Sequence, residues 1–276
     1  MYPVPTRHAL QPIVSTKLHK SVINALEIMS GTSPEPILAS AGSDFTIHLT
    51  PLPVSSTRSN STSHALTPLL SPKGHTRAVT TLLHCTNDNL LSGSKDGSLR
   101  MWDIRSGTQK ATWALQQPVV ALAGAAGDPT GTVWVALADG SVQSLDTRAS
   151  TPVTKLAAGA AAARTIAVSG DGREIALGGA DGTAALFDVH GGSIRRRWKR
   201  GGAPIHCVSF APGDRVVIGG EDGLPHVIDF SKGDDHAGLH VSELVFGNVE
   251  TVRALRVSEE FIYVAGDGGV VRKYGL

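Results

Sequence analysis

The sequence predicts an all-β chain built from six copies of one unit of about forty residues. Aspartate recurs in six turn-like contexts, and successive copies lie 41 to 52 residues apart. Each copy follows a short apolar run, and the 31 glycines and 15 prolines of the 276-residue chain provide for many turns. No window shows the 3.6-residue apolar spacing of an amphipathic helix. The six turn aspartates are Asp44, Asp96, Asp139, Asp181, Asp222 and Asp267.

Within each unit the apolar runs place the strands in order. The first strand lies about fifteen to twenty residues before the turn, as in AVTTLLH (78–84) and PIHCVSF (204–210). The second strand leads into the turn, as in NLLSG (89–93), and Asp with Gly supplies the positive φ that a two-residue hairpin needs. A third, alternating strand follows, as in SLRMWD (98–103). Four strands in such a period are the signature of a β-propeller blade.

One unit carries a sequence motif in addition to this pattern. It reads GHTRAVTTLLH and then LLSGSKDGSLRMWD, and it resembles the WD-repeat β-propeller family, in which Gly-His opens a blade and Trp-Asp closes its third strand. The resemblance extends over nearly the whole chain, but only this unit has the full motif. Elsewhere LD, FD, ID and KY replace Trp-Asp, and His19 lacks the preceding glycine, so several blades are expected to lack the complete set. The resemblance implies a hydrogen-bonded structural tetrad of His75, Ser92 (or Ser94), Asp96 and Trp102.

The motif of this unit resembles a catalytic triad, and the glycine-rich turns of the other units resemble phosphate-binding loops. A catalytic serine needs an exposed hydroxyl with a base directed at it, whereas Ser92 and Ser94 fall within a strand of a repeat. The glycine strings GGADG, GGEDG and AGDGG lie between strands, so they lack the helix N-terminus on which a phosphate loop relies. We therefore expect no catalytic residues, no cofactor and no enzymatic activity.

Six units fill residues 1–276 as a single propeller domain. The last unit stops after its third strand, and we expect residues 7–14 (RHALQPIV) to supply its outermost strand and close the ring. A seventh blade would have to lie around 53–64, which looks like a polar loop, and a ring left open for a strand of a partner is the third alternative. The expected blades span about 15–70, 71–115, 116–156, 157–199, 200–244 and 245–276.

The composition of the chain limits the kinds of partner and the cell compartment that we expect for it. The 25 Lys+Arg residues balance 24 Asp+Glu, so no overall field selects nucleic acid or a membrane surface. Cys85 and Cys207 are too few for a disulfide framework, and we expect both to be buried small side chains. No signal peptide or membrane-spanning run is seen, which predicts an intracellular protein, cytoplasmic or nuclear. We expect its partners to be other proteins and not small molecules.

The residue after the first apolar position of each first strand is the main candidate for partner binding. By resemblance to WD-repeat propellers, this position lies at one mouth of the central channel. Basic residues there would form a crescent suited to an acidic or phosphorylated segment of a partner. The alternative is that the arginines are isolated surface charges and the histidine packs in the channel wall. The candidates are Arg164, His206 and Arg253 on three consecutive blades, Asn24 next around the ring, and Arg77 and Lys95 as extensions.

Two adjacent units carry an Asp-x-Arg sequence, Asp103 with Arg105 and Asp146 with Arg148. This resembles the box by which some WD-repeat proteins dock onto the adaptor of a cullin-RING ubiquitin ligase, and it implies a substrate receptor as an alternative function. The competing interpretation is a local ion pair on the surface.

Two further segments invite functional interpretations. IRRRWKR (194–200) could contact RNA, as in an assembly or processing factor, but basic residues on an outer strand also prevent edge-to-edge pairing. GDDHAGLH (233–240) contains carboxylates and histidines, but nothing elsewhere pairs with it, so we expect no metal. The favoured function is a non-catalytic scaffold for protein–protein interaction within a larger complex.

Overall fold

The computed structural model describes an all-β chain, and the described residues contain no helix that could cross a membrane. The expected closing strand (7–14), the polar loop (53–64) and most of the segment 233–240 lie outside the described residues. The described residues are 17–29, 36–52, 74–85, 88–124, 131–149, 152–156, 162–199, 201–230, 240–244 and 250–276.

These residues form six antiparallel sheets, which we call blades 1 to 6 in chain order. Blades 2 to 5 each have four strands, whereas blades 1 and 6 have three within the described part of the chain. The strands are β1 (Ile23–Met29), β2 (Ile37–Gly42) and β3 (Ile47–Pro51) in blade 1; β4 (Val79–Cys85), β5 (Asn89–Ser94), β6 (Ser98–Asp103) and β7 (Gln109–Ala114) in blade 2; β8 (Val119–Gly124), β9 (Thr132–Leu137), β10 (Val142–Asp146) and β11 (Pro152–Leu156) in blade 3; β12 (Ala163–Val168), β13 (Glu174–Gly179), β14 (Thr183–Asp188) and β15 (Ser193–Lys199) in blade 4; β16 (Ile205–Ala211), β17 (Arg215–Gly220), β18 (His226–Asp229) and β19 (His240–Glu243) in blade 5; and β20 (Val252–Val257), β21 (Phe261–Gly266) and β22 (Val271–Gly275) in blade 6.

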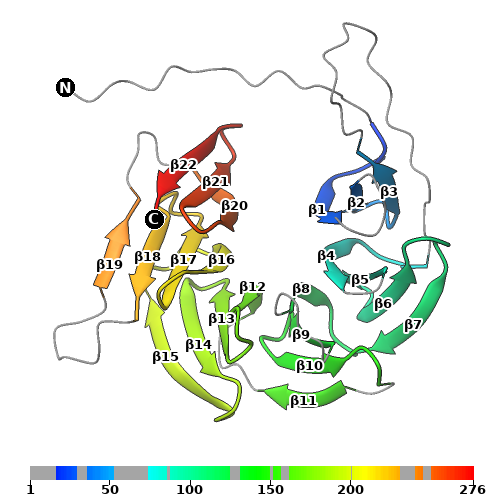
Figure 1. Cartoon of the computed structure of the whole chain (residues 1–276), viewed down its shortest axis with the longest axis horizontal. Coiled ribbons are helices and arrows are strands. Elements are labelled where there is room, and N and C mark those ends of the chain that lie inside the picture. The colour runs from blue at the N-terminus through cyan, green and yellow to red at the C-terminus, as the bar shows by residue number, and fades with distance from the viewer. Residues whose placement is uncertain are drawn as a thin grey trace, which may run out of the picture.

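The blades are arranged around a common centre, with the first strand of each blade innermost (Figure 1). Within every blade the strands follow one another as a meander, so each pairs with its sequence neighbour. In blades 2 to 5 the second strand is almost wholly buried because it has a neighbouring strand on both edges and other blades against its faces, whereas β21 of blade 6 is buried at only two of its six residues. This is why the second strands read as continuous apolar runs in the sequence.

The core is divided among the junctions between blades. Five hydrophobic clusters fill the five junctions from blade 1/blade 2 to blade 5/blade 6, each combining residues of both sheets. In the blade 1/blade 2 junction, for example, Leu49 of blade 1 and Val79 of blade 2 belong to one cluster. Inner strands of consecutive blades contact one another at all five junctions.

Blades 6 and 1 are separated by a gap (Figure 1). Among the described residues, no hydrophobic cluster joins these two blades, in contrast to the five other junctions. The described sheets therefore form an open arc of six blades, and the expected closure by residues 7–14 stays a prediction.

Each inner strand carries a β-bulge at the same position. In all six blades the pairing between the first and second strands shifts register by one residue near the start of the first strand. The extra residue is directed away from the regular ladder, which is how a bulge changes the aim of a side chain. The six bulge residues are Asn24, Thr80, Val120, Arg164, His206 and Arg253.

Candidate interaction surface on the inner strands

The bulge residues are the same six positions that the sequence singles out at the channel mouth. In blades 1 and 2 their side chains join one inner strand to the next. Asn24 Nδ2 donates to the Val79 carbonyl at 2.8 Å, and Thr80 Oγ1 donates to the Val119 carbonyl at 2.8 Å. The bulge therefore directs its side chain toward the following blade.

In blades 4 to 6 the bulge residues are the two arginines and the histidine of the predicted crescent, and the structure brings the three together. Arg164 Nη1 lies 3.4 Å from His206 Nδ1, and Arg253 Nη1 lies 3.3 Å from His206 Nε2. Both arginines are exposed and His206 is half-buried. We call these three residues the crescent.

The crescent has more hydrogen-bond donors than acceptors. A neutral imidazole has one donor nitrogen and one acceptor nitrogen, yet an arginine N–H group faces each ring nitrogen of His206. One arginine must therefore face an imidazole N–H. Partial burial, together with Arg253 and Arg164, holds the pKa of His206 below its ordinary value, which keeps the ring neutral near pH 7.

One carboxylate already pairs with the crescent. Asp267 accepts hydrogen bonds from Arg253 Nε at 2.8 Å and Nη2 at 2.9 Å, which leaves the Nη1 side of the guanidinium toward His206. Among the described residues no carboxylate forms an ion pair with Arg164. The arrangement favours an anion that accepts from Arg164 and from the imidazole N–H.

The other predicted members of the crescent lie apart from it. Asn24 takes part in the blade 1/blade 2 junction described above. The hydrogen bonds recorded for Arg77 and Lys95 are backbone ones: the Arg77 carbonyl accepts from Ser94 Oγ, and the Lys95 N–H donates to the Ala78 carbonyl. No described contact joins these three residues to His206.

In blade 2 the four residues assigned to the tetrad form one hydrogen-bonded chain. His75 Nδ1 lies 3.0 Å from Asp96 Oδ2, and His75 Nε2 lies 2.7 Å from Ser92 Oγ. Trp102 Nε1 donates to the same serine oxygen at 2.7 Å. Ser92 has no exposed surface, so its hydroxyl is not available to attack a substrate. Ser94, the alternative, instead donates to the Arg77 carbonyl.

Blade 1 contains a similar chain that the sequence reasoning missed. His19 Nδ1 lies 3.0 Å from Asp44 Oδ1, and His19 Nε2 lies 2.8 Å from Ser40 Oγ, although no glycine precedes His19. Thr50 occupies the place of the tryptophan, and its buried hydroxyl has no hydrogen-bond partner among the described residues. Ser40 precedes Asp44 by four residues, as Ser92 precedes Asp96, and this shared spacing, with a histidine upstream of each pair, was the signal that could have found it.

Hydrogen bonding explains the charge states in these chains. Burial alone would raise the pKa of Asp96, but donation from Ser98, the Thr76 N–H and His75 outweighs it and lowers that pKa to about 2. The pKa of Asp44 is held well below its usual range in the same way, with burial opposed by His19, the Lys20 N–H and Thr46. Burial lowers the pKa of His75, opposed by Asp96, so the pair resembles a neutral imidazole donating to a carboxylate.

The second Asp-x-Arg box forms an ion pair within itself, whereas the residues of the first box pair with other side chains. Asp146 accepts from Arg148 Nε and Nη2, each at 2.9 Å. Arg105 Nε instead pairs with Asp88, while Asp103 pairs with Lys110. Both arginines are exposed, and adaptor docking through them stays a prediction.

The basic run lies on β15, the outer edge strand of blade 4. Exposure alternates along it, with Arg196 and Trp198 half-buried over Phe230 and Arg197 exposed. This packing gives the strand a structural role, and RNA contact through its exposed residues stays a prediction.

The two cysteines are packed, and most of the possible metal ligands lie outside the described residues. Burial raises the pKa of both Cys85 and Cys207 to about 12, which fits unreactive packed thiols. No group of three possible metal ligands occurs among the described residues, and Asp234, Asp235 and His236 lie outside them. His240 begins β19.

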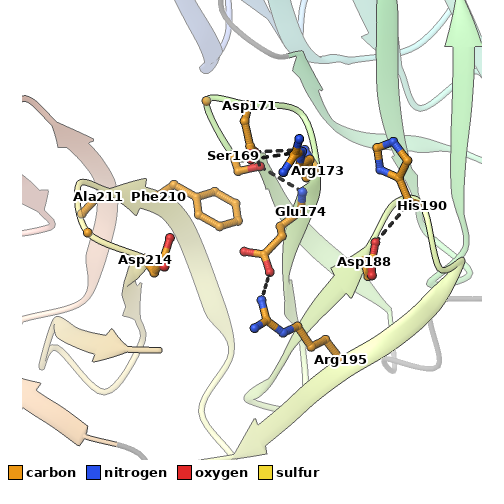
Figure 2. Close-up of a pocket in the computed structure, with 12 residues that line it drawn as sticks. Ser169, Asp171, Arg173, Glu174, Asp188, His190, Arg195, Phe210, Ala211 and Asp214 are labelled. Carbon is orange, nitrogen blue, oxygen red and sulfur yellow. Dashed lines mark hydrogen bonds and ion pairs between the residues drawn. The ribbon is translucent and has the colours of Figure 1, made fainter. Parts of the chain in front are cut away.

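A pocket of about 650 Å³ lies between blades 4 and 5, at the strand ends opposite the crescent (Figure 2). Its lining includes Phe210 and more carboxylates than arginines: Arg195 pairs with Glu174 and Arg173 lies 3.8 Å from Asp171, while Asp188 and Asp214 add two further carboxylates. Ser169 Oγ donates to Asp171 Oδ1 at 2.6 Å. Unlike the crescent, this pocket has no surplus of donors that would select a ligand.

Residues 66–103, which include the blade 2 tetrad, match the family described as WD domain, G-beta repeat. The crystal structure of the WD40 β-propeller domain of Doa1 is similar with a TM-score of 0.71 and 19% identity, over 92% of this chain and 79% of that one.

Curated sequence relatives are named mitochondrial division protein 1. That of Coccidioides immitis is 31% identical over 153 residues, covering 52% of this chain and 19% of the relative. That of Sclerotinia sclerotiorum is 29% identical over 151 residues, covering 52% of this chain and 19% of the relative. The chain thus spans about a fifth of the length of these relatives.

Proposed function

We propose that this chain, which has a β-propeller fold and matches the WD-repeat family model over residues 66–103, is a non-catalytic interaction scaffold within a larger intracellular complex. It captures an acidic or phosphorylated segment of a partner protein at the crescent of Arg164, His206 and Arg253. The observation that carries this proposal is the donor surplus around His206, where two arginines face one neutral imidazole. The mitochondrial division named for the relatives is not part of the proposal, because the chain matches only about a fifth of each.

The geometry supports an extended ligand. The crescent extends across the inner strands of three consecutive blades, β12, β16 and β20, so an extended segment can meet all three side chains in turn. Arg164 is exposed and lacks a described carboxylate partner, so it provides the strongest charge. Arg253 is partly neutralised by Asp267 and would contribute mainly through Nη1.

The proposal can be tested with two fluorescent peptides, one rich in glutamate and one containing phosphoserine, titrated with the full chain while anisotropy is measured. We expect the double variant Arg164→Glu with Arg253→Glu to weaken binding of at least one peptide about a hundredfold, because two charge-assisted contacts are lost. Binding by the wild type should also weaken as salt is raised.

The matched control carries the same charge change elsewhere. Arg197 and Arg215 are both arginines outside the crescent, and the double variant Arg197→Glu with Arg215→Glu should leave peptide affinity close to that of the wild type. Equal losses in the two double variants would mean that only net charge matters. That result, or failure of the wild type to bind either peptide, would contradict the proposal.

A further inference from the structure

The face of blade 1 that borders the gap is apolar and uncovered. Leu26 pairs with Ser40 as Leu82 of blade 2 pairs with Ser92, so the two leucines hold equivalent places. Leu82 is buried against blade 1 and is 7% exposed, whereas Leu26 is 60% exposed. Ile23, at the place of the fully buried Val79, is 48% exposed.

Blade 6 shows the same contrast on its own side of the gap. Val271 pairs with Ala265 as Leu99 of blade 2 pairs with Gly93, so Val271 and Leu99 are equivalent. Leu99 is fully buried against blade 3, whereas Val271 is 65% exposed. Tyr263 likewise replaces the buried Leu91 and is 37% exposed. Within the described part of the chain, the two faces that meet another blade everywhere else in the arc therefore meet none here.

We propose that the gap receives a β-sheet segment of another protein, a blade supplied in trans, with one apolar face against blade 1 and the other against blade 6. Blades 2 to 5 present two such faces, one toward each neighbour, and the gap lies between one face of each kind. The face that contains Leu26 is of the kind that packs against the preceding blade, as Leu82 does. The face that contains Val271 is of the kind that packs against the following blade, as Leu99 does. A single inserted sheet satisfies both.

Two other occupants satisfy these faces less well. A strand of this chain added beyond β22 would extend blade 6 in the plane of its sheet and would leave Val271 uncovered. A second copy that placed its blade 1 against this blade 6 would make a head-to-tail contact, and one face of each kind would remain exposed at the ends.

Charge indicates the chemistry of the inserted segment. Arg256 and Lys273 of blade 6 hold the places of Leu83 and Met101, which pack against blade 3. Lys273 Nζ lies 3.4 Å from the centre of the Phe261 ring, and within the described residues neither cation has a carboxylate at ion-pair distance. Burial raises the pKa of Glu27 in blade 1, although the charge of Arg256 acts on that carboxyl and opposes the rise. The partner segment should therefore carry acidic residues on the face that meets blade 6, among apolar ones.

The test places a benzophenone amino acid at Leu26 or at Val271, one position per protein, in the full chain expressed in its native cells. After irradiation, the labelled peptides are identified by mass spectrometry. We expect both positions to label one partner within a single stretch of about forty residues, the length of a blade. The control position, Arg197 on the exposed face of β15, should not label that stretch.

Several results would overturn the proposal. These are labels between the two faces within one chain, labels on residues 1–16, labels between two copies of this chain, labels on two unrelated proteins, and no label at either position. An oxidised cysteine pair made from Ile28→Cys and Tyr263→Cys provides a second measurement. Ready formation of that disulfide in the full chain would show that the faces meet directly, with no room for a blade.

Variants then separate this surface from the crescent. Leu26→Asp and Val271→Asp should each lower recovery of the labelled partner about tenfold or more, whereas Arg197→Glu should not. The double variant Arg164→Glu with Arg253→Glu should keep the partner in the gap. Loss in that variant alone would place the partner at the crescent and would contradict insertion at the gap.

Discussion

At Ser92, two ring nitrogens from distant parts of the blade meet one hydroxyl. His75 belongs to the segment before the inner strand and Trp102 to the third strand, so the serine joins three parts of blade 2 inside the sheet stack. Because all three groups are buried, water cannot replace a lost hydrogen bond, and losing one would leave a polar group unpaired. These hydrogen bonds therefore stabilise the fold of blade 2.

Ser92→Ala should destabilise the chain by about 1–3 kcal/mol, because it leaves His75 Nε2 and Trp102 Nε1 buried without a partner. Ser106→Ala, in an exposed turn of the same blade, is the matched control and should change stability by less than about 0.5 kcal/mol. Urea denaturation followed by tryptophan fluorescence measures both. Equal midpoints for the two variants would show that the buried chain contributes nothing.

His206 should make peptide binding at the crescent depend on pH. Its pKa is below the ordinary 6.5 in the free protein, and a bound anion raises it, so binding takes up a proton. Affinity for the glutamate-rich peptide should therefore increase as the pH falls from 7.5 to 5.5. His206→Gln should have a nearly flat profile over that range, and an unchanged profile in this variant would exclude the histidine as the cause.

Residue patterns reveal some of these sites and conceal others. The Gly-His and Trp-Asp pairs led directly to the blade 2 chain, and strand register led to the six bulge positions. The blade 1 chain was hidden because Thr50 replaces the tryptophan and no glycine precedes His19. The contacts of His206 with both arginines could not be derived, because they depend on the lengths of side chains crossing between blades.

Each second strand carries a small residue where the next blade approaches. A Cβ at Gly93, Gly178 or Gly219 would lie 2.4 Å from a methyl group of Val119, Ile205 or Val252, the first residues of the following inner strands. Alanine takes this position in blades 1, 3 and 6. The small residue thus determines how closely consecutive blades pack.

Gly219→Ala should destabilise the chain by about 1–3 kcal/mol, because the added methyl group collides with Val252 and with Cys207 Sγ at 2.9 Å. Ala265→Val makes a larger addition at the equivalent position of blade 6, where the face borders the gap. It should be tolerated within about 0.5 kcal/mol. Thermal unfolding of both variants provides the comparison, and a larger loss for Ala265→Val would mean that this face is covered.

Across the whole molecule, the sequence predicts the sheets better than their arrangement. Six similar units predict six similar blades, and six antiparallel sheets are present among the described residues, because each strand is specified by its own apolar pattern and turn. An open ring was only one of three alternatives, beside closure by residues 7–14 and a seventh blade. The sequence could not decide among them, because Leu26 and Leu82 stand at the same place in the repeat and have similar apolar neighbours. What distinguishes them is whether another sheet lies opposite, and that is not encoded near either residue.

The same pair provides a test of the arc. Leu82→Asp should destabilise the chain by about 3 kcal/mol or more, because it places a charge within the blade 1/blade 2 cluster. Leu26→Asp at the equivalent place should cost less than about 0.5 kcal/mol in the isolated chain. Chemical denaturation of the purified protein measures both. Comparable losses would show that the ring is closed over Leu26.

The gap also gives the molecule two ends. A closed ring supports every blade from both sides, but among the described residues blades 1 and 6 each share a hydrophobic cluster with one neighbour only. Stability then behaves as in a linear stack of repeats, in which the terminal units open more readily than the central ones. Amide hydrogen exchange should accordingly be slowest in the second strands of blades 3 and 4 and faster toward both ends. Binding in the gap would remove that gradient, so the exchange profile itself would report whether the stack has become a ring.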